Sequence, residues 1–145
     1  MKLTQFTDYA YRSLIYLAIN PGQLVQIQDI ADSYNLSKHH LTKVIQKLSY
    51  LGYVETVRGK GGGIRMAMPA EDINIGKVLR GMEGPVCVVE CLGDSSQCVI
   101  EPGCVLKPVL ARATEAFIHV LDDYTLADLT KRPAELGSLL FPENA

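Results

Sequence analysis

The chain has 145 residues and a formal net charge of −2, with 48% hydrophobic and 21% charged residues. This balance is that of one ordinary folded domain, or of a small domain with an extension, and it excludes a disordered or low-complexity chain. Charge is divided unevenly, because residues 1–66 hold eight Lys and Arg against four Asp and Glu, whereas residues 67–145 hold six against twelve. The first half can therefore meet a polyanion that the second half would repel.

The first predicted element is an amphipathic helix over residues 5–20. Apolar residues recur there at steps of three and four, and Asn-Pro-Gly at 20–22 ends the pattern. Thr4 or Thr7 can cap the start of the helix. Asp8 then lies in the first turn, where a carboxylate interacts favourably with the helix dipole.

A helix-turn-helix is predicted next. A short extended piece at 24–27 leads into a helix over 27–34, and a break at 35–36 separates it from a helix over 38–51. The inner face of the second helix is aliphatic, whereas its outer face carries basic and hydrogen-bonding groups, as in a helix that enters a DNA major groove. A merely solvated helix would show a similar face. The predicted DNA contacts of this segment are Ser37, which can also cap the helix, Lys38, His39, His40, Thr42 and Lys43.

The stretches 53–57 and 63–68 alternate between apolar and polar residues and predict a β-hairpin. Its tip, Arg-Gly-Lys-Gly-Gly at 58–62, is rich in glycine and doubly charged. A hairpin directly after a recognition helix is a wing, whose glycines let the backbone approach phosphates or enter the minor groove. A nucleotide-binding loop is disfavoured, because this one joins two strands and opens no helix. The predicted DNA contacts of the wing are Arg58, Lys60, Gly61 and Arg65.

The second half of the chain is predicted to be helical on both sides of one irregular segment. A short amphipathic helix covers 74–82, and Gly-Pro at 84–85 ends it. Beyond the irregular segment, a long helix over 107–124 carries an apolar stripe. A stripe that faces away from so small a domain is typical of a helix buried against another chain.

The chain is predicted to end with a short helix and a tail. Residues 125–129 form the helix, which Thr125 and Asp128 can cap reciprocally. We expect the tail from Pro133 to be loosely held, although the apolar residues at 139–141 should not be fully exposed.

All four cysteines lie between Cys87 and Cys104, in a stretch rich in turn-forming residues. We therefore expect a loop whose thiolates can point at one centre. The apolar run at 14–19 is too short for a signal peptide and lies inside a helical pattern. We expect a cytoplasmic protein without a membrane partner, in which disulfides would rarely persist.

Three interpretations of the cysteines are open on their spacing. Structural zinc favours two thiolates separated by two to four residues, and only the step from Cys87 to Cys91 fits. The wider steps to Cys98 and Cys104 favour a larger object, such as a cubane iron–sulfur cluster held by thiolates. Inert or redox-switching thiols are the third interpretation.

Several motifs are informative together, namely FTDYAYRSLIYLA, LTKVIQKLSYLGYVETVRGKGGGIRMA, INIGKVLRGMEG and the late cysteines followed by a helix. Over nearly the whole chain they resemble the iron–sulfur winged-helix transcriptional repressors, and the LDDYTLADL ending is similar to the nitric-oxide-sensitive branch. The resemblance implies a homodimer with cross-packed long helices and a 4Fe-4S cluster held by Cys91, Cys98 and Cys104. It also implies that a carboxylate matching Asp8 completes the cluster from the partner subunit.

Two departures from the family pattern affect the fourth ligand. Cys87 is additional, and the gap from Cys91 to Cys98 is long, so Cys87 is an alternative to Asp8. The sister branch, which regulates cluster assembly, binds a 2Fe-2S cluster through three cysteines and a histidine just beyond the last cysteine. Lys107 stands there in this chain, which favours 4Fe-4S over 2Fe-2S.

The sequence thus predicts a mainly α protein with a small β-hairpin, an α+β fold. Its parts are a winged helix-turn-helix DNA-binding domain at 1–84, a cluster-binding cysteine loop at 85–104, and a dimerisation helix with a C-terminal tail at 105–145. The predicted function is a nitric-oxide-sensing repressor that binds palindromic operator DNA as a homodimer and is released when its cluster reacts. The alternative is a regulator of cluster assembly, or a cluster-free thiol redox sensor, on the same scaffold. We expect no enzymatic activity, because the chain has neither a dinucleotide fingerprint nor a nucleophile motif.

Overall fold

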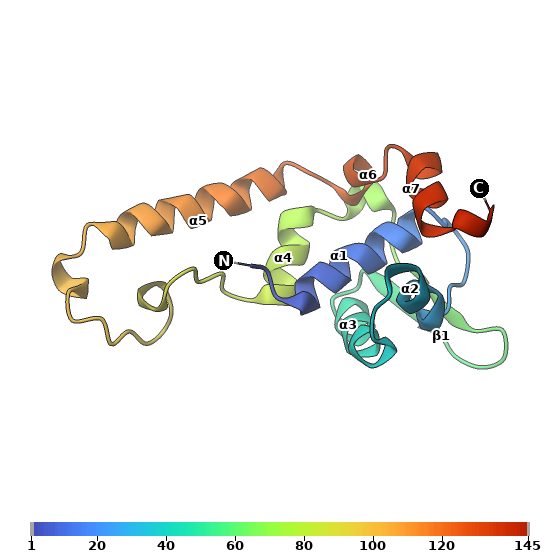
Figure 1. Ribbon diagram of the computed structural model, residues 1–145, viewed down its shortest axis with the longest axis horizontal. Coiled ribbons are helices and arrows are strands. Elements are labelled where there is room, and N and C mark those ends of the chain that lie inside the picture. Colours follow the sequence, from blue (N-terminus) through green and yellow to red (C-terminus); the bar gives the residue numbers. More distant parts are fainter. Residues whose placement is uncertain (1, 145) are drawn as a thin grey trace.

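The computed structural model describes residues 2–144 and consists of a helical body with a protruding arm (Figure 1). The body contains α1 (Gln5–Ala18), α2 (Ile27–Tyr34), α3 (Lys38–Tyr50), β1 (Val54–Val57), β2 (Gly63–Met66) and α4 (Ile75–Glu83). The arm consists of an outgoing loop and of α5 (Leu106–Asp122), which runs back towards the body. The chain ends on the body with α6 (Leu126–Leu129) and α7 (Pro133–Leu140). Short 3-10 turns lie at Ala70–Asp72, Glu90–Leu92, Glu101–Gly103 and Pro142–Asn144.

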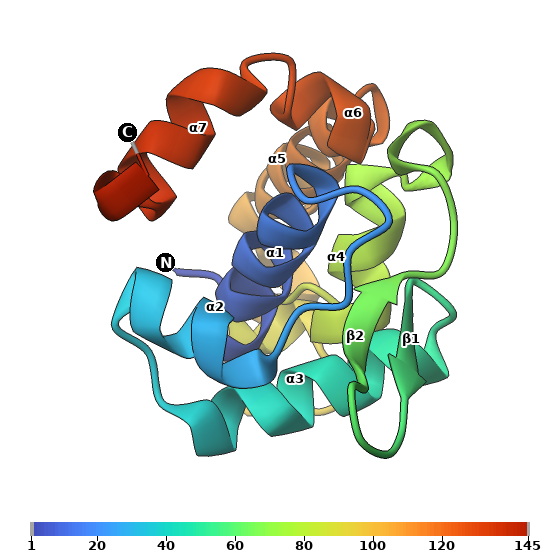
Figure 2. The same cartoon turned by 90° about the vertical axis from the view of Figure 1, so that its right-hand side faces the viewer.

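The core of the body forms around α1, which the other helices of the body surround (Figure 2). Leu14 and Leu17 of α1 are at most 1% exposed, and the predicted inner face of α3 is buried against the same core. Removing such aliphatic side chains from water stabilises the fold by roughly 1.5–3 kcal/mol each. The periodicity of apolar residues therefore determines which face of each helix points inward.

Side chains at the predicted positions cap these helices. Thr4 accepts a hydrogen bond from the backbone N–H of Thr7 at the start of α1, and Ser37 accepts one from His40 at the start of α3. Asn35 ends α2 with a left-handed backbone, φ 52°, a conformation that asparagine tolerates better than most residues. The sharp turn between α2 and α3 follows from this residue.

The wing is a two-stranded antiparallel hairpin that is also joined to the segment before α2. Glu55 pairs with Arg65 and Thr56 with Ile64 across the hairpin. Ile64 in turn exchanges both backbone hydrogen bonds with Val25, at 2.8 and 2.9 Å. The base of the wing is thus fixed to the helix-turn-helix by backbone contacts that a short extended segment supplies.

The C-terminal end packs on the body. Leu126 of α6 is fully buried, and its N–H donates to the carbonyl of Ile73 at 2.8 Å. The expectation of a loosely held tail is wrong, because residues 133–140 form α7 and Phe141 contacts Tyr16 edge to face, with ring centroids 5.2 Å apart. Pro133 is compatible with a first helical turn, and the ring contact holds the end of the chain against α1.

Much of the apolar surface of α5 faces away from the body, although Leu121 of the predicted stripe packs against the core. Thr114 is the buried residue of this helix, whereas Leu106, Val109 and Val120 are 58%, 54% and 57% exposed. A row of aliphatic side chains this exposed is unusual on a surface that stays in water. The arm therefore presents an apolar face that the fold of one chain does not cover.

Candidate DNA-binding interface and cysteine loop

The recognition helix α3 presents its predicted contact residues on one side. Thr42 donates from Oγ1 to the carbonyl of Lys38 at 2.9 Å, which holds this half-buried hydroxyl against the helix. The other predicted side chains are exposed, whereas the opposite side of α3 is anchored in the core. The exposed ones are Ser37, Lys38, His39, His40 and Lys43. A helix held by its inner face, with two lysines on its free side, can lie in a major groove without reorganising.

The wing tip owes its shape to glycine. Gly59 and Gly61 have positive φ angles of 97° and 75°, and a Cβ on Gly62 would lie 2.1 Å from the carbonyl oxygen of Val57. Only glycine fits such a turn. Arg58, Lys60 and Gly61 are exposed at the tip.

Arg65 is held differently from the other predicted cations of the wing. Its guanidinium forms an ion pair with Glu55 across the hairpin. The positive charge of Arg65 is therefore partly offset within the wing. Lys60 at the tip is the more available cation for a phosphate.

Two glutamines that sequence reasoning missed lie beside these residues. Gln26 and Gln28, at the start of α2, line a groove of about 400 Å³ together with Lys38 and the wing tip. A local signal was present, because Asp29 stands three residues after Gln26 and accepts a hydrogen bond from its backbone N–H. The contact between Gln26 and the wing depends on the tertiary fold and has no such signal.

The cysteine loop connects α4 with α5 and has no regular structure apart from two 3-10 turns. All four thiols are free; Cys87 is exposed, and Cys91, Cys98 and Cys104 are half-buried. The Cys87 thiol donates to the carbonyl of Leu92 at 3.3 Å. Between residues 2 and 144, no group of three His, Cys, Asp or Glu side chains converges closely enough to hold a metal ion. The donors are thus accessible thiols on an irregular loop, not a closed site.

The Lys107 ammonium lies near two of the thiols. It pairs with Glu101 at 2.5 Å, and this contact, with smaller contributions from Cys91 and Cys104, raises the pKa of Lys107. Cys91 and Cys104 therefore lie close to the same cation. Three half-buried thiols on one loop, two of them near an ammonium, suit an anionic thiolate-bound group, so the donor set fits an iron–sulfur cluster.

Asp8 lies on α1, outside the cysteine loop. Its carboxylate pairs with Arg12 at 2.8 Å, and both side chains are about half exposed. Asp8 occupies the first turn of α1, as expected for a carboxylate that interacts with the helix dipole. Its exposure also leaves the carboxylate accessible to a second subunit, and the assignment as a ligand stays a prediction.

Glu83 connects the first turn of α1 with the start of the cysteine loop. Its carboxylate accepts hydrogen bonds from the hydroxyls of Thr4, at 2.8 Å, and Thr7, and from the N–H of Thr4 at 3.1 Å. Burial alone would raise the pKa of Glu83, but these hydrogen bonds hold it below its ordinary value. An ionised Glu83 therefore fixes the end of α4 on the turn that carries Asp8.

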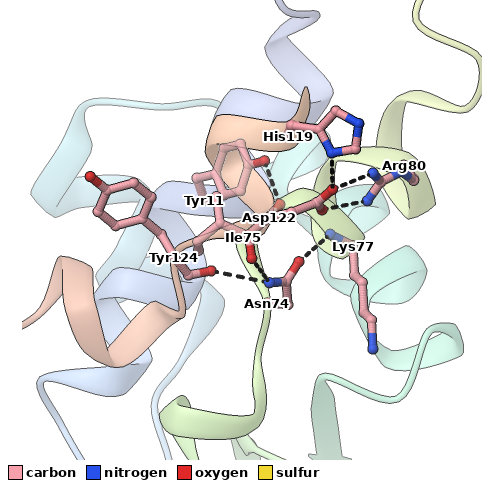
Figure 3. A network of polar contacts seen from close by, with 8 residues as sticks. All are labelled: Tyr11, Asn74, Ile75, Lys77, Arg80, His119, Asp122 and Tyr124. Atoms are coloured by element: carbon pink, nitrogen blue, oxygen red, sulfur yellow. Dashed lines mark hydrogen bonds and ion pairs between the residues drawn. The ribbon is translucent and has the colours of Figure 1, made fainter. Parts of the chain in front are cut away.

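The C-terminal end of α5 is joined to α4 by a polar network (Figure 3). Arg80 donates two hydrogen bonds of 2.6 Å to the carboxylate of Asp122, and this contact lowers the pKa of Asp122. Asn74 donates from Nδ2 to the Asp122 carbonyl at 2.7 Å, and His119 lies 3.8 Å from the carboxylate. A Cβ on Gly76 would lie 1.9 Å from Asp122 Oδ1. The absence of a side chain at 76 is what lets α5 approach α4 so closely.

Comparison with known proteins places this geometry among transcriptional regulators. Residues 3–132 match the family model described as Rrf2, iron-dependent transcriptional regulator. The chain is 53% identical to the HTH-type transcriptional regulator NsrR of Bacillus subtilis, covering 97% of each protein, and 51% identical to that of Bacillus licheniformis, covering 97% of this chain and 99% of that protein.

Solved structures agree with this comparison. The global cysteine regulator CymR of B. subtilis matches with a TM-score of 0.73 and 30% identity, covering 90% of this chain and 97% of that one. IscR of T. potens matches with a TM-score of 0.72 and 30% identity, covering 90% and 87%. The predicted winged-helix fold is confirmed by these neighbours. No helix within residues 2–144 is both long and apolar enough to span a membrane.

Proposed function

Because the chain belongs to the Rrf2 family and is a transcriptional regulator similar to NsrR, we propose that it is a repressor that leaves its operator in response to nitric oxide. The observation that carries the proposal is the position of the four free thiols, on the loop between the winged-helix body and α5. A chemical change at the loop can then alter how the arm is held. The proposal assigns DNA binding to residues 1–84, cluster binding to 85–104 and dimerisation to 105–145.

The proposed cofactor is a 4Fe-4S cluster held by Cys91, Cys98 and Cys104. When bound, it would supply an iron centre that reacts with nitric oxide. The fourth ligand is Asp8 of the partner subunit in this proposal, because the Asp8 carboxylate is accessible on α1 and Cys87 is turned towards the carbonyl of Leu92. Such a ligand would connect the loop of one subunit to the DNA-binding body of the other.

The chain's own contacts can carry a change at the loop to the DNA-binding surface. Glu83 fixes the start of the loop on the first turn of α1, and α1 packs directly on α3. At the other end of the arm, the Arg80–Asp122 pair holds α5 on α4. A displaced arm would therefore change the spacing and orientation of the two recognition helices of a dimer. On a palindromic operator these two helices must lie about 34 Å apart. Switching occupancy from nearly complete to nearly absent takes roughly 5.5 kcal/mol of preference for one state.

The test is to purify the full chain anaerobically, to count iron and sulfide, and to measure binding to a duplex that the protein selects from a random-sequence library. We expect about four irons per chain, DNA retention that weakens with salt, and release on addition of nitric oxide. Two irons per chain, or a complex that ignores nitric oxide, would instead favour a regulator of cluster assembly. Specific DNA binding by an iron-free chain would contradict the proposed cofactor.

A cluster-free thiol sensor is the second candidate, and one observation favours it. All four thiols are free and none is buried in the core, so oxidants can reach them. The anaerobic iron count separates the two candidates. An iron-free chain whose DNA binding changes with a mild thiol oxidant would be a thiol sensor.

A further inference from the structure

In the proposed complex, one strand of the DNA backbone runs through the groove between the recognition helix and the wing. It holds about 400 Å³ and is walled by the start of α2, by Lys38 and by the wing tip. In the proposed function, α3 enters a major groove and the wing enters the flanking minor groove. One sugar–phosphate strand separates those two grooves of B-DNA. That strand has to cross the space between α3 and the wing.

The side chain of Gln26 joins two walls of this groove. Its Nε2 donates to the carbonyl oxygen of Gly62 at 2.5 Å. Its own backbone is fixed, because its N–H donates to Asp29 Oδ2 at 3.1 Å and its carbonyl accepts from the Asp29 N–H at 3.0 Å. Gln26 thus connects the first turn of α2 to the wing, while its own backbone is held by the two hydrogen bonds with Asp29.

This contact reaches further along the wing than the backbone pairing does. The Val25–Ile64 pair supports β2, and a Cβ on Gly63 would lie 2.8 Å from the Val25 carbonyl oxygen, so the backbones are in close contact there. Gly62 lies just before the first residue of β2, in the turn of the hairpin. Gln26 therefore extends the support of the helix-turn-helix to the tip of the wing, which carries the free cation Lys60.

We propose that Gln26 is a positioning residue for DNA binding, which holds the wing at the distance from α3 at which a DNA phosphodiester strand fits into the groove. The Lys38 ammonium provides the charge for a phosphate in this groove, and the Thr56 side chain on the wing wall adds a hydroxyl. The inference rests on the proposed function, because the path of the DNA strand follows from the proposed docking of α3 and the wing.

Gln28 is a matched control within the same groove. Its Nε2 donates to Asp32 Oδ1 at 2.7 Å, along α2, and so its side chain bonds its own helix and not the wing. Both glutamines are exposed and line the groove. Loss of the amide at 28 removes similar surface without releasing the wing.

The experiment compares Gln26→Ala and Gln28→Ala with the wild-type full chain, purified anaerobically, on the duplex selected by the wild type. Loss of one hydrogen bond corresponds to a change of about 3- to 10-fold in affinity. We expect Gln26→Ala to weaken binding by about that factor and to lose hydroxyl-radical protection of the flanking minor groove. Protection of guanine N7 in the major groove from dimethyl sulfate should be kept. Gln28→Ala should change affinity less than about 2-fold and keep both protections.

Ethylation interference on the wild-type complex tests the groove without any variant. Ethylation of the phosphates between the major-groove and minor-groove contacts should abolish binding, and binding that tolerates it overturns the inference. Unchanged affinity and footprint for Gln26→Ala, or equal losses for Gln26→Ala and Gln28→Ala, overturn it as well. A wild-type chain that selects no duplex contradicts the proposed function itself, which makes the two failures distinguishable.

Discussion

The four cysteines differ in their surroundings, although the sequence presents them as one group. Cys91 and Cys104 lie near the Lys107 ammonium, and Cys98 is half-buried like them. Cys87 is exposed, and its thiol is bonded to the carbonyl of Leu92 within the loop. The half-buried three are therefore the better ligand set.

The first prediction compares two of these thiols. Cys98→Ala should remove essentially all iron from the anaerobically purified chain, because a cluster cannot be held with one of its three thiolates missing. Cys87→Ala should retain the iron and sulfide content of the wild type. Iron and sulfide counts per folded chain, with circular dichroism as a folding check, provide the measurement. If Cys87→Ala loses iron and Asp8→Ala keeps it, Cys87 and not Asp8 is the fourth ligand.

The second prediction concerns Glu83 and pH. The hydrogen bonds from Thr4 and Thr7 lower its pKa in the folded chain below the ordinary value of 4.5. This group therefore contributes stability above about pH 4.5, and the contribution is lost as the pH falls through the lower folded pKa. Glu83→Gln should lower the free energy of unfolding by roughly 1 kcal/mol at pH 7, a value that already allows for the partial exposure of Glu83. At pH 3 the loss should be much smaller.

Urea unfolding at the two pH values measures this difference, and Glu71→Gln is the control. Glu71 lies exposed on a 3-10 turn. If Glu83→Gln loses as much free energy of unfolding at pH 3 as at pH 7, the contact requires the shape of the side chain and not its charge.

Among the elements, local signals predicted the helices well and tertiary contacts poorly. The caps Ser37 and Thr125 and the apolar periodicity fix α3 and α6, because both act within a few residues. The tail was misinterpreted because the contact of Phe141 with Tyr16 joins the two ends of the chain. The pairing of Arg65 with Glu55 depends in the same way on the register of the hairpin.

The third prediction tests the wing. Lys60 is exposed at the tip, and we expect it to contact a phosphate and no base. Lys60→Ala should therefore weaken binding to all duplexes about equally and reduce the salt slope by about 1. Arg65→Ala should have a smaller effect, since Glu55 already offsets the charge of Arg65. Salt titration of DNA affinity measures both slopes. Equal slopes for Lys60→Ala and the wild type would remove the wing tip from the interface.

The fourth prediction concerns the joint between α4 and α5. Gly76→Ala places a methyl group 1.9 Å from Asp122 Oδ1, so either the carboxylate has to leave Arg80 or the two helices have to separate. We expect a loss of about 1–3 kcal/mol in the free energy of unfolding, as for other overpacked sites. In the double variant Gly76→Ala/Asp122→Ala the clashing carboxylate is gone, so the loss should be smaller than the sum of the two single losses by about 1 kcal/mol. Strictly additive losses in urea unfolding would mean that Asp122 is not what excludes a side chain at 76.

At the scale of the whole molecule, the sequence indicates which segments carry the positive charge, the thiols and an apolar stripe, but not the contacts between subunits. The positive first half supplies the helix-turn-helix and the wing, and the cysteines lie on the loop between α4 and α5. The sequence predicts a loop whose thiolates can point at one centre, whereas residues 2–144 of one chain bring no three ligand groups together by themselves. A ligand site that needs a bound group and a partner carboxylate has no complete signal in a single sequence. The same holds for the exposed face of α5, for which we predict another molecule as the occupant.

The last prediction is that this face holds the dimer together. Val109 and Val120 are eleven residues apart, about three helical turns, so they share one side of α5 and are both more than half exposed. Val109→Asp would bury a charge in an aliphatic interface, so dimer dissociation should become at least about 100-fold easier. Glu115→Lys is the control, because Glu115 lies on the other side of the helix from this stripe.

Sedimentation velocity over a range of protein concentrations measures the dissociation constants. Because two half-sites are bound together only by a dimer, Val109→Asp should also bind the selected duplex much more weakly than Glu115→Lys does. A Val109→Asp chain that stays dimeric at the concentrations where the wild type does would place the subunit contact elsewhere. The exposed stripe would then need another occupant, and the idea that Asp8 reaches the partner's cysteine loop would lose its geometric basis.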